Sequence, residues 1–175
     1  MTETVQFFRH KKLEGKVAII TGGACGMADI EDALGQNVAN SIGDGQCTYM
    51  HCDVTNEDQV KALVDSTVET FGKLDIMFSN ARVGKTGESA QTILDFNLDA
   101  SDRLFAINTR GMAACVKHAA RVMVEGGVKG GSIVCTGSLA ESVGMAQFID
   151  YVMSKHAVVA NTVLFLASQD SQFIT

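Results

Sequence analysis

The 175-residue sequence predicts an α/β fold in which a parallel sheet is flanked by helices. Three observations support this prediction. Short apolar runs alternate with longer stretches of helical periodicity, the pattern of a parallel sheet built from strand–helix units. The first run leads into a glycine-rich turn, and the last one ends in small polar residues, as strands beside a binding crevice do. The length is enough for one domain with a hydrophobic core, so residues 1–175 are treated as a single domain.

Four apolar runs are the expected strands, at residues 16–21, 47–54, 74–81 and 132–138. The expected helices are residues 29–42, 56–72 and 104–124, and one further helix that carries Tyr151. If helix 29–42 is a right-handed crossover, the strand order is 47–54, 16–21, 74–81, 132–138. That helix has a predicted buried stripe of Ile30, Ala33, Leu34, Val38 and Ile42. The prediction is thus a Rossmann-like sheet, reduced in strand number and with exposed edges.

The glycine-rich turn follows strand 16–21 and reads Gly22-Gly23-Ala24-Cys25-Gly26. Glycines in such a turn let the backbone approach a pyrophosphate, which indicates a dinucleotide-binding unit. An acidic residue that holds the ribose is expected about 20 residues further on, yet Asp29 lies three residues past Gly26. A crossover needs at least about 10–12 residues. The first crossover helix and the second strand therefore cannot both be present, and Asp29 is either an acidic helix-start residue or a cofactor ligand.

A second group of functional candidates lies in residues 131–155. Strand 132–138 leaves the Ser138 hydroxyl at its carboxyl end, where the ligands of α/β sheets bind. Tyr151 and Lys155 are four residues apart, so on a helix they lie on one side, about one turn apart. A nearby ammonium favours the phenolate of a tyrosine, whose ordinary pKa is about 10. Together these side chains suit proton transfer to or from an alcohol or carbonyl oxygen, although a bare Tyr-x-x-x-Lys pair also arises by chance.

With these residues and the turn at Thr21, Gly22 and Gly26, the sequence resembles the short-chain dehydrogenase/reductase family. The resemblance is to its plant group containing secoisolariciresinol dehydrogenase, xanthoxin dehydrogenase and momilactone A synthase. It implies NAD-dependent oxidation or reduction of a substrate that is a secondary alcohol or ketone and a plant specialised metabolite. It gives Tyr151 as the acid/base, Lys155 as its activator and ribose contact, Ser138 as the substrate-oxygen donor and Asn108 as a relay through water. The cofactor contacts it implies are Gly22, Cys25, Gly26, Met27, Asp29, Asp53, Val54, Asn80, Ala81 and Lys155.

The sequence also departs from the family pattern. Ala28 stands in place of the last glycine of the turn, and Arg82 stands where Asn80-Ala81 should be followed by glycine. The first crossover, the sixth strand with its substrate loop and the final strand have no counterpart, which implies a truncated domain. Asp29 implies NAD rather than NADP, because it would repel a second phosphate. The alternative function is a catalytically impaired, shortened family member that binds cofactor weakly and acts through association with relatives. The resemblance implies a homo-oligomer, weaker or less ordered than is usual in the family.

Composition narrows the partners and the compartment. A net charge of −6 argues against nucleic acid or an anionic membrane as a partner. No apolar run reaches the roughly 20 residues needed to span a bilayer, and the N-terminus lacks the pattern of a secretory signal. The five cysteines are odd in number and lack Cys-x-x-Cys spacing, which favours free thiols in the cytoplasm. The four histidines have no ligand spacing with them, so no metal site is expected.

Overall fold

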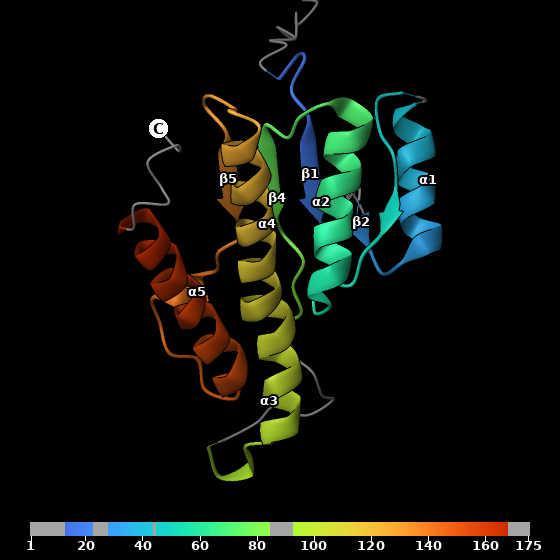
Figure 1. The fold of residues 1–175 in the computed structure, drawn as a ribbon. Coiled ribbons are helices and arrows are strands. Elements are labelled where there is room, and N and C mark those ends of the chain that lie inside the picture. The colour runs from blue at the N-terminus through green and yellow to red at the C-terminus, as the bar shows by residue number, and fades with distance from the viewer. Residues whose placement is uncertain (1–12, 23–27, 44, 85–92, 168–175) are drawn as a thin grey trace, which may run out of the picture.

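A computed structural model describes residues 13–22, 28–43, 45–84 and 93–167, with only the backbone from residue 161 onward. Within these ranges the chain forms a five-stranded parallel sheet in the order β3-β2-β1-β4-β5 (Figure 1). The strands are β1 (Ala18–Thr21), β2 (Ala28–Asp29), β3 (Met50–His51), β4 (Ile76–Ser79) and β5 (Ser132–Cys135). The predicted fold class is confirmed.

The predicted place of strand 47–54 is wrong, because β2 lies between β1 and β3. The prediction that the second strand is missing together with the first crossover helix is also wrong. Instead, Ala28 pairs with Thr21, so β2 begins level with the last residue of β1. The link between them needs to cross only one strand spacing, about 4.8 Å, and no crossover helix is required. β2 and β3 are each two residues long, and of the predicted strand 47–54 only Met50 and His51 are paired.

The described helices match the predicted segments with shifted ends. They are α1 (Asp32–Ile42), α2 (Glu57–Phe71), α3 (Leu98–Phe105), α4 (Met112–Glu125) and α5 (Ile149–Ala167), with short 3₁₀ turns η1 (Ile93–Asp95) and η3 (Leu139–Glu141). Asn56 caps α2, where its side chain accepts hydrogen bonds from the backbone of Asp58 and Gln59. The predicted helix 104–124 is part of a longer one, since α3 and α4 are joined by a π-helical segment, η2 (Ala106–Gly111).

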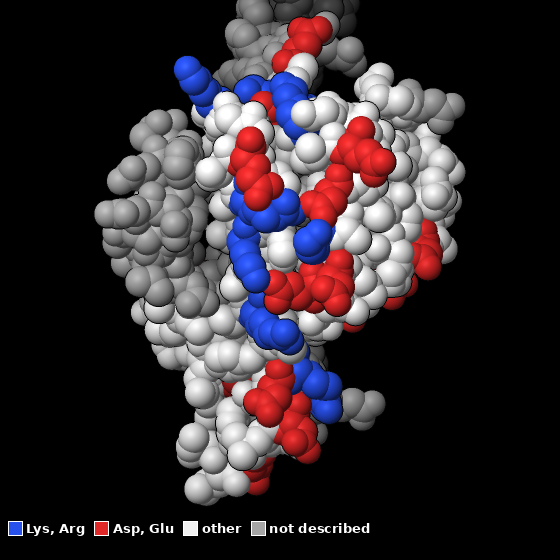
Figure 2. All heavy atoms as spheres, viewed as in Figure 1, with Lys and Arg blue, Asp and Glu red and all other residues white. Residues whose placement is uncertain are grey.

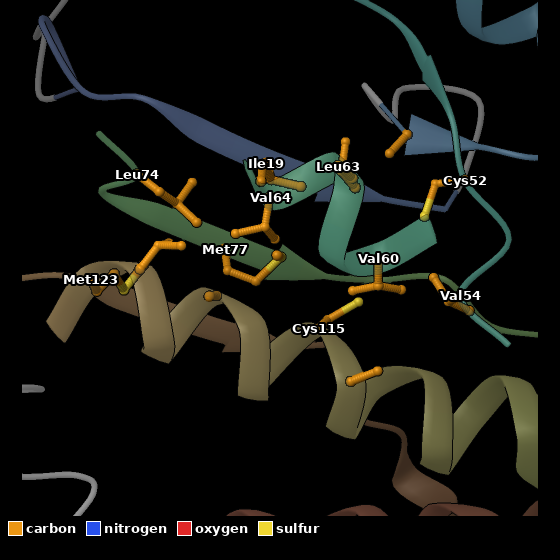
Figure 3. Close-up of a cluster of buried hydrophobic side chains, with 14 residues drawn as sticks. Ile19, Cys52, Val54, Val60, Leu63, Val64, Leu74, Met77, Cys115 and Met123 are labelled. Carbon is orange, nitrogen blue, oxygen red and sulfur yellow. The ribbon is translucent and has the colours of Figure 1, made fainter. Parts of the chain in front are cut away.

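The core lies between one face of the sheet and helices α2 and α4 (Figures 1 and 3). Ile19 and Met77 project from the strands toward Val60 and Val64 of α2 and Cys115 of α4, and all five are buried. Burial alternates along β1 and β4, as expected for strands with one covered face. The opposite face of these two strands is only partly buried. Because right-handed crossovers place α1 on the face opposite α2, α1 covers the β2–β3 end of that face.

The buried stripe predicted for helix 29–42 is wrong. The buried residues of α1 are Gly35 and Ala39, whereas Leu34 and Ile42 are about half exposed, at 51% and 49%. Gly35 decides this orientation, because an added Cβ would lie 2.1 Å from the Tyr49 ring. The stripe was predicted from the spacing of its apolar residues alone, and no described helix lies next to α1 on that face.

Basic side chains form a row along α4, and acidic side chains lie beside it over α2 (Figure 2). Lys117 of α4 bonds Glu57 of α2 at 2.7 Å, and Arg121 pairs with Asp65. These pairs leave no large basic area on the face shown. Among the helices whose placement is described, none is long and apolar enough to cross a membrane.

Asp75 is the buried carboxylate that joins the starts of β1 and β4. It accepts a hydrogen bond from Val17 N–H at 2.9 Å and pairs with Lys16 and Lys73. Burial opposes ionisation of Asp75, but the Val17 N–H and the two ammonium groups outweigh it and lower the pKa to about 2. Because the pKa of Asp75 is lower in the folded state, its ionised carboxylate stabilises the fold at pH values above the ordinary pKa near 3.8. This stabilisation is lost as the pH falls toward 2.

We therefore expect Asp75→Asn to lower the free energy of unfolding at pH 7 by about 2 kcal/mol or more. In the variant, the free energy of unfolding should also fall less between about pH 4 and pH 2, because the contribution of the Asp75 carboxylate is absent. Urea unfolding from pH 2 to pH 7 measures both effects. Asp102→Asn, on the exposed side of α3, is the matched control and should behave like the unmodified chain. Equal pH curves for the two variants would contradict the assignment.

Candidate active site

A chain of hydrogen bonds ties together the carboxyl ends of β1, β4 and β5. The Asn80 side-chain amide donates to the Gly22 carbonyl at 2.5 Å, and the Thr136 hydroxyl donates to Asn80 Oδ1 at 2.8 Å. Lys155 Nζ, from α5, then donates to the Thr136 carbonyl at 3.1 Å. On the other side, the Thr21 hydroxyl oxygen accepts from the backbone of Asn80 and Ala81. These bonds link Gly22, at the end of β1, to Lys155 of α5 through Asn80 and Thr136.

Lys155 and Tyr151 lie on the same side of α5, as predicted. The Lys155 Nζ atom is 5.9 Å from the centre of the Tyr151 ring, within the range of a cation–π contact. Lys155 is fully buried, at 0% exposure, which is rare for lysine unless it is paired. An ammonium has three N–H donors, and the described residues supply Nζ with one acceptor, the Thr136 carbonyl. A buried cation with donors to spare points to a polar ligand at this position.

Ser138 begins the 3₁₀ turn η3 directly after the end of β5. Its Oγ accepts a hydrogen bond from Ala140 N–H at 3.2 Å, and its own N–H donates to the Glu141 carboxylate at 2.9 Å. This capping box fixes the side-chain rotamer. Because Oγ acts as an acceptor, the hydroxyl hydrogen is left to donate to another oxygen. The turn η3 packs against α5, which carries Tyr151.

Asn108 lies in the π-helical segment η2 and is fully buried. Its side chain accepts from Val83 N–H and donates to the Val83 carbonyl, both at 2.9 Å. It also donates to Ser154 Oγ at 3.2 Å, and Ser154 in turn donates to the Tyr151 carbonyl. The Asn108 side chain therefore positions the strand-end segment and the Tyr151 turn. Short π-helical segments are often found at functional sites.

The proposed adenosine contacts lie at the ends of β2 and β3. Asp29 is the last residue of β2, and its carboxylate accepts from the backbone N–H groups of Ile30 and Glu31. Since α1 starts at Asp32, Asp29 is a strand-end residue, and the interpretation as a helix-start residue is wrong. Asp53 binds the N–H of Thr55, and Val54 is buried in the core. Three further predicted contacts, Cys25, Gly26 and Met27, lie outside the described residues.

Gly22 and Ala81 are in close contact across β1 and β4. Gly22 has a φ of +71°, and a Cβ added to it would lie 2.1 Å from Ala81 Cα. Only glycine fits this position on both counts. Arg82, which replaces the glycine of the family pattern, is exposed and does not enter this contact.

Replacing Gly22 by alanine should therefore lower the free energy of unfolding by roughly 3 kcal/mol or more, from backbone strain and the clash together. The matched control is Gly130→Ala, at φ +70° with open space around the added Cβ. That change carries the strain alone, about 1–2 kcal/mol. Equal losses in thermal or urea unfolding would show that the contact with Ala81 does not constrain the turn.

The described cysteines are free thiols. Burial raises the pKa of Cys52 to about 12 and that of Cys115 to about 11, so these thiols are unreactive. Burial also raises the pKa of Cys135, partly offset by the nearby Lys155. No cluster of three or more metal-ligating side chains occurs in the described ranges.

Two functional residues were missed by the sequence analysis. Thr136 links Asn80 to Lys155, and Ser154 links Asn108 to Tyr151. Ser154 directly precedes Lys155 on a buried helix face, where a serine needs a hydrogen-bond partner. The position of Ser154 on the helix was therefore the one sequence signal that could have indicated its role. Nothing in the sequence distinguishes Thr136 from an ordinary residue at the end of a strand.

A parallel sheet with a tyrosine–lysine pair at its carboxyl edge has these side chains where the ligands of open α/β sheets bind. A family profile described as "Enoyl-(Acyl carrier protein) reductase" matches residues 19–162. The chain therefore belongs to the short-chain dehydrogenase/reductase family.

Curated plant relatives share close to half of their aligned residues with this chain. A (+)-cis,trans-nepetalactol synthase of Nepeta racemosa is 49% identical, over 85% of this chain and 62% of its own length. The (−)-isopiperitenol/(−)-carveol dehydrogenase, mitochondrial, of Mentha piperita is 46% identical, with the same coverage. Secoisolariciresinol dehydrogenase of Forsythia intermedia is 44% identical, over 87% of this chain and 60% of its own length. The chain thus spans about three fifths of these relatives.

Solved structures agree on the fold. A short-chain dehydrogenase/reductase from Burkholderia phymatum in complex with NAD superposes with a TM-score of 0.78 at 27% identity, covering 91% of this chain and 62% of that chain. The apo form of LigO from Sphingobium sp. superposes with a TM-score of 0.79 over 93% of this chain and 66% of that one, and at 24% identity it supports the fold alone.

Proposed function

We propose that the protein is an NAD(H)-dependent oxidoreductase that acts on a secondary alcohol or ketone of plant specialised metabolism. The observation that carries the proposal is the fully buried Lys155 ammonium, held by Thr136 beside the Tyr151 ring. Burial of a lysine without a carboxylate partner is costly, and a structural role alone gives no reason for it. The relatives support the substrate class, because two of them are named as alcohol or lignan dehydrogenases.

The described residues fit the ribose ends of a dinucleotide. Asp29 ends β2, where its carboxylate suits the adenosine ribose hydroxyls. Lys155 has N–H donors that no described residue accepts, and these suit the second ribose. A carboxylate at position 29 would repel a 2′-phosphate, which favours NAD over NADP. When bound, the nicotinamide accepts or supplies the hydride.

The residues of this chain then handle the proton. Ser138 donates its hydroxyl hydrogen to the substrate oxygen and orients it toward Tyr151. The Tyr151 phenolate takes the hydroxyl proton during oxidation and returns it during reduction. Lys155 favours the phenolate electrostatically. Asn108 positions the Tyr151 turn through Ser154, and a proton relay through water is assigned to its π-helical backbone rather than to its fully bonded side chain.

The second candidate function is a catalytically impaired family member that acts through association with relatives. It is favoured by the six residues between β1 and β2, which are too few for a crossover helix. Self-association weaker than in the family also stays a prediction. The free thiols of the four described cysteines favour the cytoplasm as the compartment.

The experiment that tests the main proposal is oxidation of a panel of secondary terpenoid and lignan alcohols with NAD, followed by NADH absorbance. Ser138→Ala should lower kcat/KM by about 10–100-fold, since one hydrogen bond to the reacting oxygen is lost. Ser142→Ala is the matched control, because Ser142 is exposed and its hydroxyl bonds only the Leu139 carbonyl. Absence of turnover with every alcohol would favour the second candidate, whereas equal rates for the two variants would mean that Ser138 does not bind the substrate oxygen.

A further inference from the structure

Gly137 is the one residue between the fixed end of the sheet and Ser138, the proposed contact of the substrate oxygen. Thr136 is held on both sides, because its N–H donates to the Ser79 carbonyl at 3.0 Å and its carbonyl accepts from Lys155 at 3.1 Å. A glycine has more backbone freedom than any other residue. Without a further contact, Ser138 would therefore be joined to the strand end by a flexible link.

The Glu141 side chain provides that further contact. Its Oε1 atom accepts from Ser138 N–H at 2.9 Å, and in the same turn Ser138 Oγ accepts from Ala140 N–H at 3.2 Å. Ala140 is buried and η3 packs against α5, so the turn that carries Glu141 is itself held in place. The carboxylate thus fixes the backbone of Ser138 relative to a packed element.

The same carboxylate explains why position 137 is a glycine. The φ of Gly137 is not positive, so its backbone conformation does not require glycine. A Cβ added at Gly137 would instead lie 2.9 Å from both carboxylate oxygens of Glu141, a separation that Cβ atoms essentially never show. Gly137 and Glu141 are therefore a matched pair, because a side chain at position 137 would displace the carboxylate.

We propose that Glu141 is a positioning residue of the active site, which holds Ser138 so that its hydroxyl donates to the substrate oxygen. The direction of the hydroxyl follows from the backbone that Glu141 fixes and from the bond that Oγ accepts. A reacting group misplaced by about 1 Å can cost about 100-fold in rate. This inference rests on the proposed function, but the contact between Glu141 and Ser138 is measurable without a substrate.

Amide hydrogen exchange of Ser138, followed by NMR on the full 175-residue chain, tests the contact itself. Glu141→Ala should speed this exchange by about tenfold or more, since the acceptor is lost. Glu141→Gln keeps an oxygen acceptor without the charge, and its exchange should stay within about threefold of that in the unmodified chain. Glu69→Ala, on the exposed side of α2, is the matched control and should leave the exchange unchanged.

Alcohol oxidation by the same variants tests the catalytic consequence. Glu141→Ala should lower kcat by about 10–100-fold while KM for NAD stays within about threefold, and Glu141→Gln should recover most of the loss. Gly137→Ala should act like Glu141→Ala, because the added methyl group displaces the carboxylate. In the Glu141→Ala background it should have little further effect, whereas a methyl group that only blocked the substrate would lower kcat in both backgrounds.

The proposal is overturned if Ser138 exchanges equally fast in Glu141→Ala and in the unmodified chain, or if the exchange is faster but kcat is unchanged. It is also overturned if Gly137→Ala lowers kcat by the same factor in both backgrounds. A chain that oxidises no alcohol would refute the proposed function and with it the catalytic role of Glu141. Equal exchange rates would refute the contact alone, so the two failures are distinguishable.

Discussion

Replacing Tyr151 by phenylalanine is expected to lower kcat for alcohol oxidation by about 10²–10⁴, the usual contribution of a general acid/base. The substitution removes only the hydroxyl, for which the described residues give no hydrogen-bond partner. Folding should therefore be nearly unaffected. The ring remains in place beside Lys155, so cofactor affinity should also be unchanged. Initial rates with NAD, together with NADH fluorescence titration, measure both quantities on the same variant.

The sequence contains one other tyrosine, Tyr49, and this provides the matched control. The Tyr49 hydroxyl bonds the Asp29 carbonyl and the Asp32 carboxylate, both at 2.7 Å, far along the chain from α5. Tyr49→Phe should change KM for NAD or stability, since it loosens the end of β2, but leave kcat within about threefold. An equal fall in kcat for both variants would mean that Tyr151 is not the acid/base.

The second large effect concerns cofactor affinity. We expect NADH to bind with a dissociation constant near 1 mM, about −4 kcal/mol. A pyrophosphate normally lies at the N-terminus of the helix after the glycine turn, where unpaired N–H groups attract it. Here α1 follows β2 rather than the turn, and the six residues between β1 and β2 are too few for a crossover helix.

Calorimetry at moderate salt measures this affinity directly. Asp29→Asn should weaken NADH binding further, because the contact with the ribose is one of the few cofactor contacts that remain. The variant should also reduce the difference in affinity between NADH and NADPH, because the carboxylate that repels the 2′-phosphate is gone. Asp102→Asn serves again as the exposed control. Micromolar NADH binding would contradict the prediction and would require residues 23–27 to supply the phosphate contacts by themselves.

The sequence by itself determined the fold class and the catalytic side chains to test. Alternation of apolar runs with helical stretches predicts a parallel sheet, because each pattern allows only one way to bury its apolar residues. The four-residue spacing of Tyr151 and Lys155 likewise fixes their relation on a helix. Both are local properties, so a single segment is enough to reveal them.

The tertiary structure alone decided how the remaining parts meet. β2 forms because Ala28 pairs with Thr21, and this register depends on contacts between distant segments. α1 turns Gly35 rather than its apolar stripe inward, because the Tyr49 ring fills the space in front of it. Thr136 and Ser154 acquire roles only when β4, β5 and α5 meet at one edge. Long-range hydrogen bonds and close packing leave no periodic trace in the sequence, which is why these features could not be predicted from it.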